Sequence, residues 1–370
     1  MARWLHLVLL LSFSTASIHA EDRKSERVYV GTYTGRGSEG IYVAELDNTG
    51  KLSTPRLAAK ITNPSFLAVH PNRQWLYAVS EVETTDGKKG GGVTAFLIDN
   101  STGILTKINS QVTGGGAPCY LSVDKKGKCV LVANYSGGSV TALPIKDDGS
   151  LGEPASFIQH TGKSINKQRQ EGPHAHSINV SADNRFAFAA DLGTDEIRIY
   201  QLDADKALLT PCQVVKTPAG GGPRHLSFHP NGHYAYVNNE MTSSVTAYRF
   251  DAAQGMLTEL GTVSTIPADF KGENSTAEVK VHGKFVYVSN RGHDSIAIFE
   301  IKDDGTLTPK GHVSTQGKTP RNFNLIGNYL VAANQDTGNV VVFKIDEKTG
   351  SLTPTGSSAK VSMPVCIVHW

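Results

Sequence analysis

Short stretches of alternating apolar and polar residues recur along the chain, separated by turn-forming residues. In residues 222–240, GPRHLSFHPNGHYAYVNNE, one such stretch leads into a Pro-Asn-Gly turn and a second stretch follows. Alternation with a period of two predicts β-strands. Because the two strands are joined by a tight turn, they are expected to form an antiparallel hairpin.

The hairpin pattern repeats through the chain. Further copies start at Pro64, Pro118, Pro173, Ala277 and Pro320, which gives a period of 43 to 55 residues. A third apolar strand and an acidic turn with the pattern Gly-x-Leu follow, as in SVTALPIKDDGSL and SIAIFEIKDDGTL. Repeats of this length with four short strands each are typical of a β-propeller.

The two ends of the chain complement each other. Residues 363–370, MPVCIVHW, supply a first strand with nothing after it, whereas residues 27–52 supply strands two to four of a unit. Joining them completes a seventh blade and leaves no exposed sheet edge. We therefore predict an all-β fold, a single seven-bladed β-propeller domain over residues 21–370, with the ring closed by pairing of the C-terminal strand with the N-terminal strands.

The first 20 residues, MARWLHLVLLLSFSTASIHA, differ from the repeats. Arg3 precedes an apolar run, and small residues follow, with Ala16 or Ala20 at the expected cleavage position. This layout predicts a secretory signal peptide over residues 1–20. A buried first strand or a membrane anchor is the alternative, although the apolar run is short for a membrane span. We expect an exported protein, periplasmic or extracellular, with no membrane span after signal removal.

Composition limits the classes of ligand and cofactor that the sequence predicts. The formal net charge of +2 gives no electrostatic reason to expect binding to nucleic acid or to an anionic membrane. The cysteines, Cys119, Cys129, Cys212 and Cys366, form no CxxC motif, which argues against a zinc site, a redox pair or a c-type haem. We interpret them as small core residues, with one disulfide left open. The oligomeric state is not predicted.

Charged residues occur at the ends of strands whose other residues are typical of a buried core. Arg224 opens the first strand of the quoted hairpin and Glu240 closes the second. These positions are neighbours in an antiparallel hairpin. Because the first strand of a propeller blade is innermost, both side chains are expected on one face, at the mouth of the central channel.

Aligning the units collects the other residues at this mouth. The first strands open at Ser65, Cys119, His176, Arg224, Glu278, Arg321 and Val365. The second strands end at Tyr33, Glu81, Tyr135, Leu192, Glu240, Arg291 and Gln335, each preceded by a small or polar residue: Thr32, Ser80, Asn134, Asp191, Asn239, Asn290 and Asn334. A concave surface with converging polar groups is the default hypothesis for a binding site.

With the units aligned, the chain resembles the lactonase family of seven-bladed propellers, which contains the propeller type of 6-phosphogluconolactonase and the fungal carboxy-muconate lactonising enzyme. The resemblance covers essentially the whole mature chain. It rests on VYVGTYT, HAHS at 174–177, GPRHLSFHPNGHYAYVNNE, SNRGHDSIAIF at 289–299 and TPRNFNL at 319–325. It implies a small-molecule lactone or its carboxylate form as substrate, and no metal or other cofactor.

The resemblance also implies a site of histidine, arginines and glutamate. The matching residues are His176, Arg224, Glu240 and Arg291. Further candidates for substrate binding are His174, Arg321, Glu81, Asn134, Asp191 and Gln335. The hypothesis is hydrolysis of a sugar-type lactone, in which a neutral histidine, His176 or its neighbour His174, takes a proton from water. An arginine would stabilise the oxyanion, and Glu240 would orient the histidine or protonate the leaving alkoxide.

Two other functions stay open. One is a carboxy-muconate-type lactonising cycloisomerase, which needs similar anion-binding groups. The other is a non-catalytic exported propeller that binds a ligand or a partner protein, since fold alone does not decide function. An apolar plug at the mouth would favour this second alternative. The polar segment HTGKSINKQRQEG, residues 160–172, is interpreted as a surface loop, with a lid over the mouth as the alternative.

Overall fold

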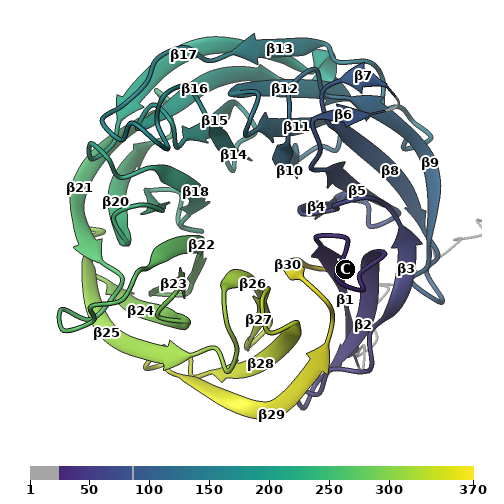
Figure 1. Cartoon of the computed structure of the whole chain (residues 1–370). Helices are drawn as coiled ribbons and strands as arrows, with labels where there is room; N and C mark the ends of the chain where they lie inside the picture. Colours follow the sequence, from purple (N-terminus) through teal and green to yellow (C-terminus); the bar gives the residue numbers. More distant parts are fainter. Residues whose placement is uncertain (1–24, 86) are drawn as a thin grey trace, which may run out of the picture.

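In the computed structural model, which describes residues 25–85 and 87–370, seven four-stranded antiparallel sheets surround a central axis (Figure 1). Each sheet is one blade, and its first strand lies nearest the axis. The predicted fold class, an all-β seven-bladed propeller, is confirmed.

In each blade the four strands lie side by side from the axis outward. Blade 1 is β30 (Pro364–His369), β1 (Ser25–Thr32), β2 (Gly40–Asp47) and β3 (Arg56–Lys60), and blade 2 is β4 (Leu67–Val69), β5 (Trp75–Ser80), β8 (Gly92–Ile98) and β9 (Leu105–Val112). Blade 3 is β10 (Pro118–Val123), β11 (Cys129–Asn134), β12 (Ser139–Pro144) and β13 (Ser156–Gln159), and blade 4 is β14 (Ala175–Val180), β15 (Phe186–Asp191), β16 (Glu196–Asp203) and β17 (Leu208–Lys216). Blade 5 is β18 (Pro223–Phe228), β19 (Tyr234–Asn239), β20 (Ser244–Asp251) and β21 (Met256–Ser264), and blade 6 is β22 (Ser275–His282), β23 (Phe285–Arg291), β24 (Ser295–Ile301) and β25 (Leu307–Ser314). Blade 7 is β26 (Pro320–Ile326), β27 (Tyr329–Asn334), β28 (Asn339–Ile345) and β29 (Leu352–Lys360); β6 (Thr84–Thr85) pairs with β7 (Lys88–Lys89), and a short 3-10 helix, η1, covers Ala204–Lys206.

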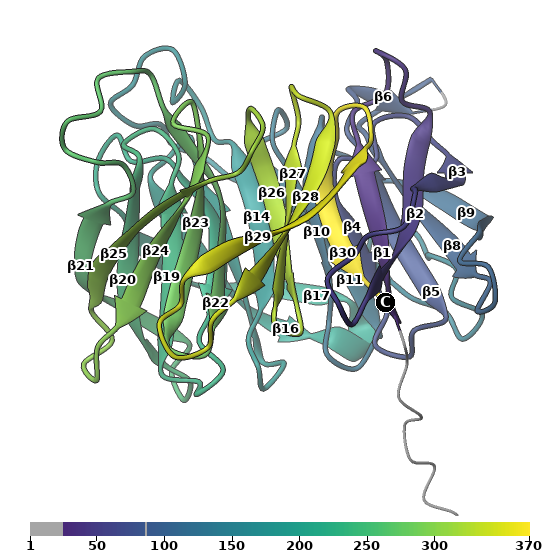
Figure 2. The same cartoon turned by 90° about the horizontal axis from the view of Figure 1, so that it is seen from below.

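The ring closes as the sequence predicts. Strands β1 and β30 pair antiparallel, with Val28 opposite His369 and Val30 opposite Ile367. Figure 2 shows the two strands side by side. Beyond β30, the backbone N–H of Trp370 donates to the carbonyl of Arg27 at 2.8 Å, and the Arg27 guanidinium lies 4.4 Å from the centre of the indole ring. The C-terminal end of the inner strand of blade 1 is thereby fixed to β1.

Neighbouring blades are joined by buried tyrosines on the second strands. The hydroxyl of Tyr287 in blade 6 donates to the carbonyl of Gly350, in the outer turn of blade 7, at 2.9 Å. Tyr236 makes the same bond to Gly305 at 3.1 Å. At Gly350 the backbone has φ +73°, and an added Cβ would lie 2.4 Å from the Phe285 ring. The repeated Gly-x-Leu turn therefore uses glycine for conformation and for space.

Two expectations concern the termini and the cysteines. The predicted signal peptide, residues 1–20, lies outside the described residues. All four cysteines are free thiols; Cys119, Cys129 and Cys366 are buried as expected, but Cys212 is exposed, which corrects its assignment to the core. Among the described residues, no helix is long and apolar enough to cross a membrane.

The tyrosine bonds between blades make a testable contribution to stability. Tyr287→Phe removes one hydroxyl and leaves the Gly350 carbonyl without its donor. We expect the free energy of unfolding to fall by about 1–3 kcal/mol, the usual effect of leaving a buried polar group unsatisfied. Urea denaturation of the variant measures the change. Tyr42→Phe, where the hydroxyl makes one exposed 3.3 Å contact, serves as the control and is expected to leave the midpoint near that of wild type.

Candidate active site

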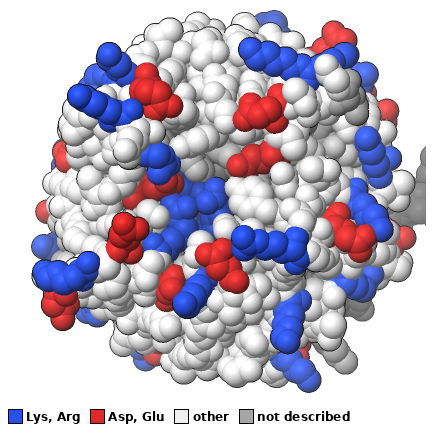
Figure 3. Space-filling model, in the orientation of Figure 1, with Lys and Arg blue, Asp and Glu red and all other residues white. Residues whose placement is uncertain are grey.

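The mouth of the channel gathers charged side chains from several blades. Figure 3 shows basic side chains in a hollow at the centre of the disc, with acidic side chains beside them. Arg224 Nε, on β18, donates to Glu240 Oε2 at 2.9 Å, and Arg291 Nη2, at the end of β23, lies 3.0 Å from the same oxygen. The predicted meeting of Arg224 and Glu240 at one face is confirmed, and Arg291 joins them.

A third guanidinium group, which the sequence analysis did not predict at the site, also contacts Glu240. Arg169, in the polar segment between β13 and β14, donates from Nη2 to Glu240 Oε1 at 2.9 Å and to the hydroxyl of Tyr135 at 3.0 Å. Burial by itself would raise the pKa of Glu240, but the charges of Arg291 and Arg224 hold that pKa well below its ordinary value. Glu240 is therefore a fixed carboxylate, which favours a positioning role over proton donation.

His176, on β14, is a buried neutral imidazole. Its Nδ1 lies 3.7 Å from Cys119 Sγ, and its ring packs edge-on against Tyr135 and His225, with centroid distances of 5.4 and 5.3 Å. Burial, followed by the charge of Arg224, lowers the pKa of His176 well below its ordinary value. Burial raises the pKa of the Cys119 thiol, so this cysteine is not a thiolate nucleophile.

Arg224 is held from behind by a chain of polar groups inside the channel. Its Nη1 donates to the carbonyl of Ala277 and lies 3.1 Å from Nε2 of His225. Because an arginine only donates, Nε2 accepts, and the hydrogen sits on Nδ1, which lies 3.1 Å from Glu278 Oε1 in a contact bent away from hydrogen-bond geometry. Burial lowers the pKa of His225 to about 4, so this ring is neutral as well.

Glu278 connects this chain to the far end of the channel. Its Oε2 accepts a hydrogen bond from Asn322 Nδ2, and Lys280 Nζ lies 3.7 Å from its Oε1. Burial would raise the pKa of Glu278, but Lys280 and His225 lower it to about 2. Lys280 and Asn322 also line a cavity of about 440 Å³ near the axis, together with Tyr120 and His369. Polar contacts thus run from the mouth to this cavity.

A second polar group stands across the mouth. Arg321 Nη2, on β26, donates to the hydroxyl of Tyr33 at 3.0 Å, and that hydroxyl donates to the Glu81 carboxylate at 2.9 Å. The mouth therefore holds four guanidinium groups, those of Arg169, Arg224, Arg291 and Arg321, and two carboxylates, those of Glu240 and Glu81. Glu171 at the rim and Glu278 behind Arg224 bring the nearby carboxylates to four, and Lys280 is a fifth cation, so the positive charge exceeds the negative by one, which favours an anionic ligand.

Three predicted substrate-binding residues are bonded elsewhere. Asn134 Nδ2 donates to Ser139 Oγ at 3.0 Å and to Thr141 Oγ1 at 3.1 Å, within its own blade. Asp191 accepts from His160 Nδ1 at 2.6 Å and from the backbone N–H groups of residues 174, 193 and 194. Gln335 Nε2 donates to the neighbouring Asp336 at 3.1 Å. The bonds of Asn134 and Asp191 brace the fold instead of facing the cluster.

His174 lies at the rim and not in the cluster. Its ring stacks on Tyr135 with centroids 4.7 Å apart, and its Nδ1 lies 3.1 Å from the Tyr135 carbonyl. A carbonyl accepts, so Nδ1 carries the hydrogen; Nε2 lies 3.3 Å from Glu171. Both nitrogens are thus engaged. Of the two histidines, His176 has the freer ring and the closer tie to the arginines.

Several buried polar atoms of the residues assigned to the mouth lack a protein partner. They include Ser65 Oγ and Arg291 Nε. Buried polar groups without a partner call for an explanation, and a ligand oxygen bound at the mouth would satisfy the guanidinium N–H. The mouth is therefore lined by charged and polar groups and not by the apolar plug that would favour a purely structural channel.

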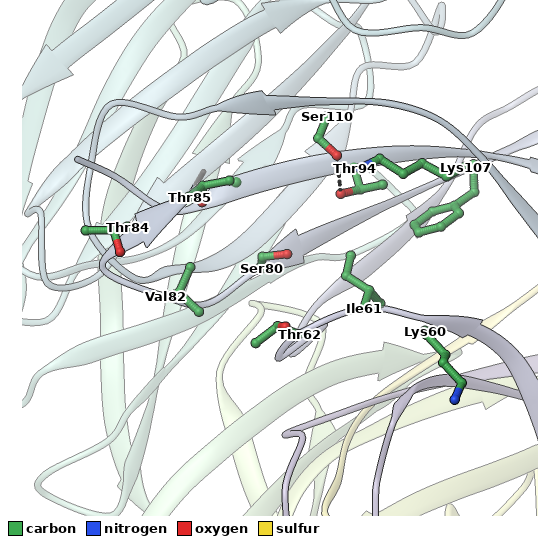
Figure 4. Close-up of a pocket in the computed structure, with 12 residues that line it drawn as sticks. Lys60, Ile61, Thr62, Ser80, Val82, Thr84, Thr85, Thr94, Lys107 and Ser110 are labelled. Carbon is green, nitrogen blue, oxygen red and sulfur yellow. Dashed lines mark hydrogen bonds between the residues drawn. The ribbon is translucent and has the colours of Figure 1, made fainter. Parts of the chain in front are cut away.

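A separate pocket lies between blades 1 and 2. It has a volume of about 330 Å³, and its lining includes Lys60, Thr62, Thr85 and Lys107. Figure 4 shows its hydroxyl groups, with the 2.9 Å bond between Thr94 and Ser110 dashed. None of the residues that line it belongs to the charged cluster at the mouth. Among the described residues, no group of three or more His, Cys, Asp or Glu side chains is arranged to hold a metal ion.

Comparison with known proteins places this architecture in a family. A family model described as a lactonase, seven-bladed β-propeller, matches residues 27–369. A 6-phosphogluconolactonase of Bacillus subtilis is 44% identical over 345 residues, which are 92% of this chain and 97% of that protein. A 6-phosphogluconolactonase of Formosa agariphila is 37% identical over 340 residues, covering 88% of this chain and 94% of that protein.

A solved structure agrees with the sequence comparisons. The periplasmic gluconolactonase of Pseudomonas aeruginosa is 32% identical, superimposes with a TM-score of 0.87, and is matched over 93% of this chain and 99% of that one. These comparisons do not support the carboxy-muconate lactonising activity that the resemblance had left open. The chain belongs to the lactonase family of seven-bladed β-propellers.

Proposed function

We propose that this protein hydrolyses the ring ester of a sugar-type lactone, as a 6-phosphogluconolactonase-like enzyme, at the mouth formed by His176, Arg224, Glu240 and Arg291. The observation that carries the proposal is a neutral imidazole buried beside guanidinium groups, one of which keeps an unpartnered N–H. Relatives that carry the 6-phosphogluconolactonase name, matched over nearly their whole length, support the substrate class.

His176 is the proposed general base. A neutral imidazole accepts a proton from water as the water oxygen attacks the lactone carbonyl. The tetrahedral intermediate then collapses, the bond between the carbonyl carbon and the ring oxygen breaks, and the imidazolium returns its proton to the departing alkoxide. One water is consumed, and the product is the open hydroxy acid.

The arginines are the proposed oxyanion donors. Arg224 is fixed by bonds to Glu240 and to the Ala277 carbonyl, and Arg291 by bonds to Glu240 and to the Thr276 carbonyl at 2.8 Å. Donors held in place before the reaction stabilise the developing charge without having to reorganise. Glu240 keeps the two cations together, which is a positioning role.

We infer that the enzyme acts outside the cytoplasm. The first 20 residues have the layout of a signal peptide, and the relative from Pseudomonas aeruginosa is described as periplasmic. The relatives are described as a 6-phosphogluconolactonase and as a gluconolactonase, so a panel that includes both phosphorylated and unphosphorylated lactones is the appropriate assay.

Replacing either central residue tests the proposed chemistry. His176→Asn removes the base, and Arg224→Lys removes the planar fork that Glu240 and the oxyanion share. Each is expected to lower kcat/KM for gluconolactone or its 6-phosphate by about a hundredfold or more. The rate is followed by the acid released, after subtraction of spontaneous hydrolysis.

Matched changes at the opposite end of the blades separate chemistry from folding. His233→Asn and Arg185→Lys alter exposed residues near the far turns and are expected to keep wild-type rates. Circular dichroism of all four variants checks that each is folded. Folded His176→Asn and Arg224→Lys proteins that retain more than about a tenth of kcat/KM would contradict the mechanism. A wild-type protein that binds sugar acids without hydrolysing any lactone would instead support the non-catalytic alternative.

The low pKa of His176 predicts the acid limb of the rate profile. Because the pKa in the folded protein lies below the ordinary value of 6.5, the base stays unprotonated as the pH falls through 6.5. We expect kcat/KM to remain level there and to fall only at a more acidic pH. Rates measured between about pH 4.5 and 7.5 test this, and an inflection at or above pH 6.5 would argue against His176 as the base.

A further inference from the structure

Arg169 bridges blades 3 and 5 at the mouth. It belongs to the segment between β13 and β14, yet its Nη2 donates to Tyr135 in blade 3 and to Glu240 in blade 5. Among the described arginines, no other side chain bonds to both blade 3 and blade 5, the two neighbours of blade 4. The segment that was interpreted as a plain surface loop therefore lies over the cluster, which was the alternative expected from the sequence.

The loop that carries Arg169 is held in place by its own hydrogen bonds. The side chain of Gln170 is fully buried; its Nε2 donates to the Leu192 carbonyl at 2.9 Å and its Oε1 accepts from the N–H of Asn166 at 3.0 Å. Asn166 Oδ1 in turn accepts from the N–H groups of Gln168 and Arg169, at 3.0 and 3.1 Å. Arg169 therefore lies in a turn whose conformation is fixed by hydrogen bonds.

The cluster is layered from the solvent inward. The side-chain exposure is 45% for Arg169, 13% for Arg291, 7% for Glu240 and 3% for Arg224. A molecule that enters the mouth meets Arg169 first and reaches Arg224 last. A substrate bound with its reacting carbonyl at the deep arginines consequently leaves its other end beside Arg169.

Arg169 has donors to spare. A guanidinium carries five N–H groups, and the hydrogen bonds of Arg169 to other described side chains use Nη2 alone. The Nε and Nη1 groups lie on different edges of the guanidinium, and each remains available to donate a single charge-assisted hydrogen bond to an anion. A phosphate monoester, whose charge is close to −2 at neutral pH, is attracted by the positive charge of Arg169 at the rim.

We propose that Arg169 is the specificity residue for a phosphate on the far end of the lactone. It binds the phosphate monoester at the rim while the ring carbonyl lies against His176 and Arg224. Arg169 also donates a hydrogen bond to Glu240, the carboxylate that positions the deeper arginines. Binding of the phosphate to Arg169 therefore changes the electrostatic environment of Glu240. This inference deepens the proposed lactonase function and rests on it.

The test compares one variant on two substrates. Arg169→Ala is assayed with 6-phosphogluconolactone and with unphosphorylated gluconolactone. The ratio of KM for the phosphorylated to the unphosphorylated lactone is expected to rise about tenfold or more, the usual effect of losing a charge-assisted hydrogen bond. Any general loss through Glu240 affects both substrates and cancels in this ratio. Lys167→Ala removes an exposed positive charge from the same loop and is expected to leave the ratio at the wild-type value.

An unchanged ratio in a folded Arg169→Ala protein would overturn the proposal, because the arginine would then serve Glu240 alone. Arg169→Lys keeps the positive charge but not the fixed N–H directions of the guanidinium, so a ratio between those of wild type and the alanine variant supports recognition of the phosphate by charge and by oriented donors.

Calorimetry separates this inference from the proposed reaction. Wild type is expected to bind 6-phosphogluconate more tightly than gluconate, and Arg169→Ala to lose about tenfold or more of that preference. This outcome supports the phosphate site even if no lactone is hydrolysed, in which case the proposed function fails by itself. Equal affinity of wild type for the two acids, with lactonase activity intact, would contradict the phosphate site and would leave the proposed lactonase function supported.

Discussion

The charged mouth depends on one buried carboxylate. Glu240 accepts hydrogen bonds from Arg169 and Arg224 and pairs with Arg291. Without it, guanidinium groups would be buried close together with little compensation, and the lowered pKa of Arg224, to about 10, already reflects burial and the repulsion from Arg291 and Arg321. Removing one partner from such a buried group is costly because a charge is left uncompensated. The carboxylate therefore permits a concentration of positive charge that water would otherwise have to screen.

The propeller supplies what this carboxylate needs. Each blade delivers the opening of its first strand and the end of its second to the same face, so residues far apart in the sequence meet without long loops. Arg224 and Glu240 come from one blade, Arg291 from the next, and His176 from the blade before. The tyrosine bonds between blades, such as that of Tyr287 to Gly350, keep neighbouring sheets in a fixed relation. The rigidity of the mouth is thus a property of the whole ring.

The repeat made the fold and the Arg224–Glu240 pair predictable, because a hairpin fixes which ends are neighbours. The same repeat misled the assignment of Asn134. An asparagine recurs at this position in Asn239, Asn290 and Asn334, and both Asn134 and Asn239 bond to a serine five residues on. A residue that recurs at one position in several blades, with the same local hydrogen bonds, belongs to the scaffold, whereas His176 occurs at its position in one blade. Asn134 recurs, and His176 does not.

Arg169 and His225 escaped prediction for different reasons. Arg169 lies in an irregular loop, and no periodic pattern states where a loop side chain points; its position in the polar insertion just before the HAH triplet was the available signal. His225 follows Arg224 directly, so strand alternation assigns it to the opposite face. The register of β18 with β19 shifts between Pro223 and Leu226, and this irregularity brings the ring of His225 to Nη1 of Arg224.

Closure of the ring by β30 also has a bearing on how the molecule is made. Strand β1 is synthesised early, but its partner on the axial side is β30, which is synthesised last. Val28 therefore cannot pair with His369 until synthesis is complete. Until then the nascent polypeptide is an open arc with an unsatisfied inner edge, and a contact of such long sequence separation forms late. The last strand to be synthesised is therefore the one that closes the ring.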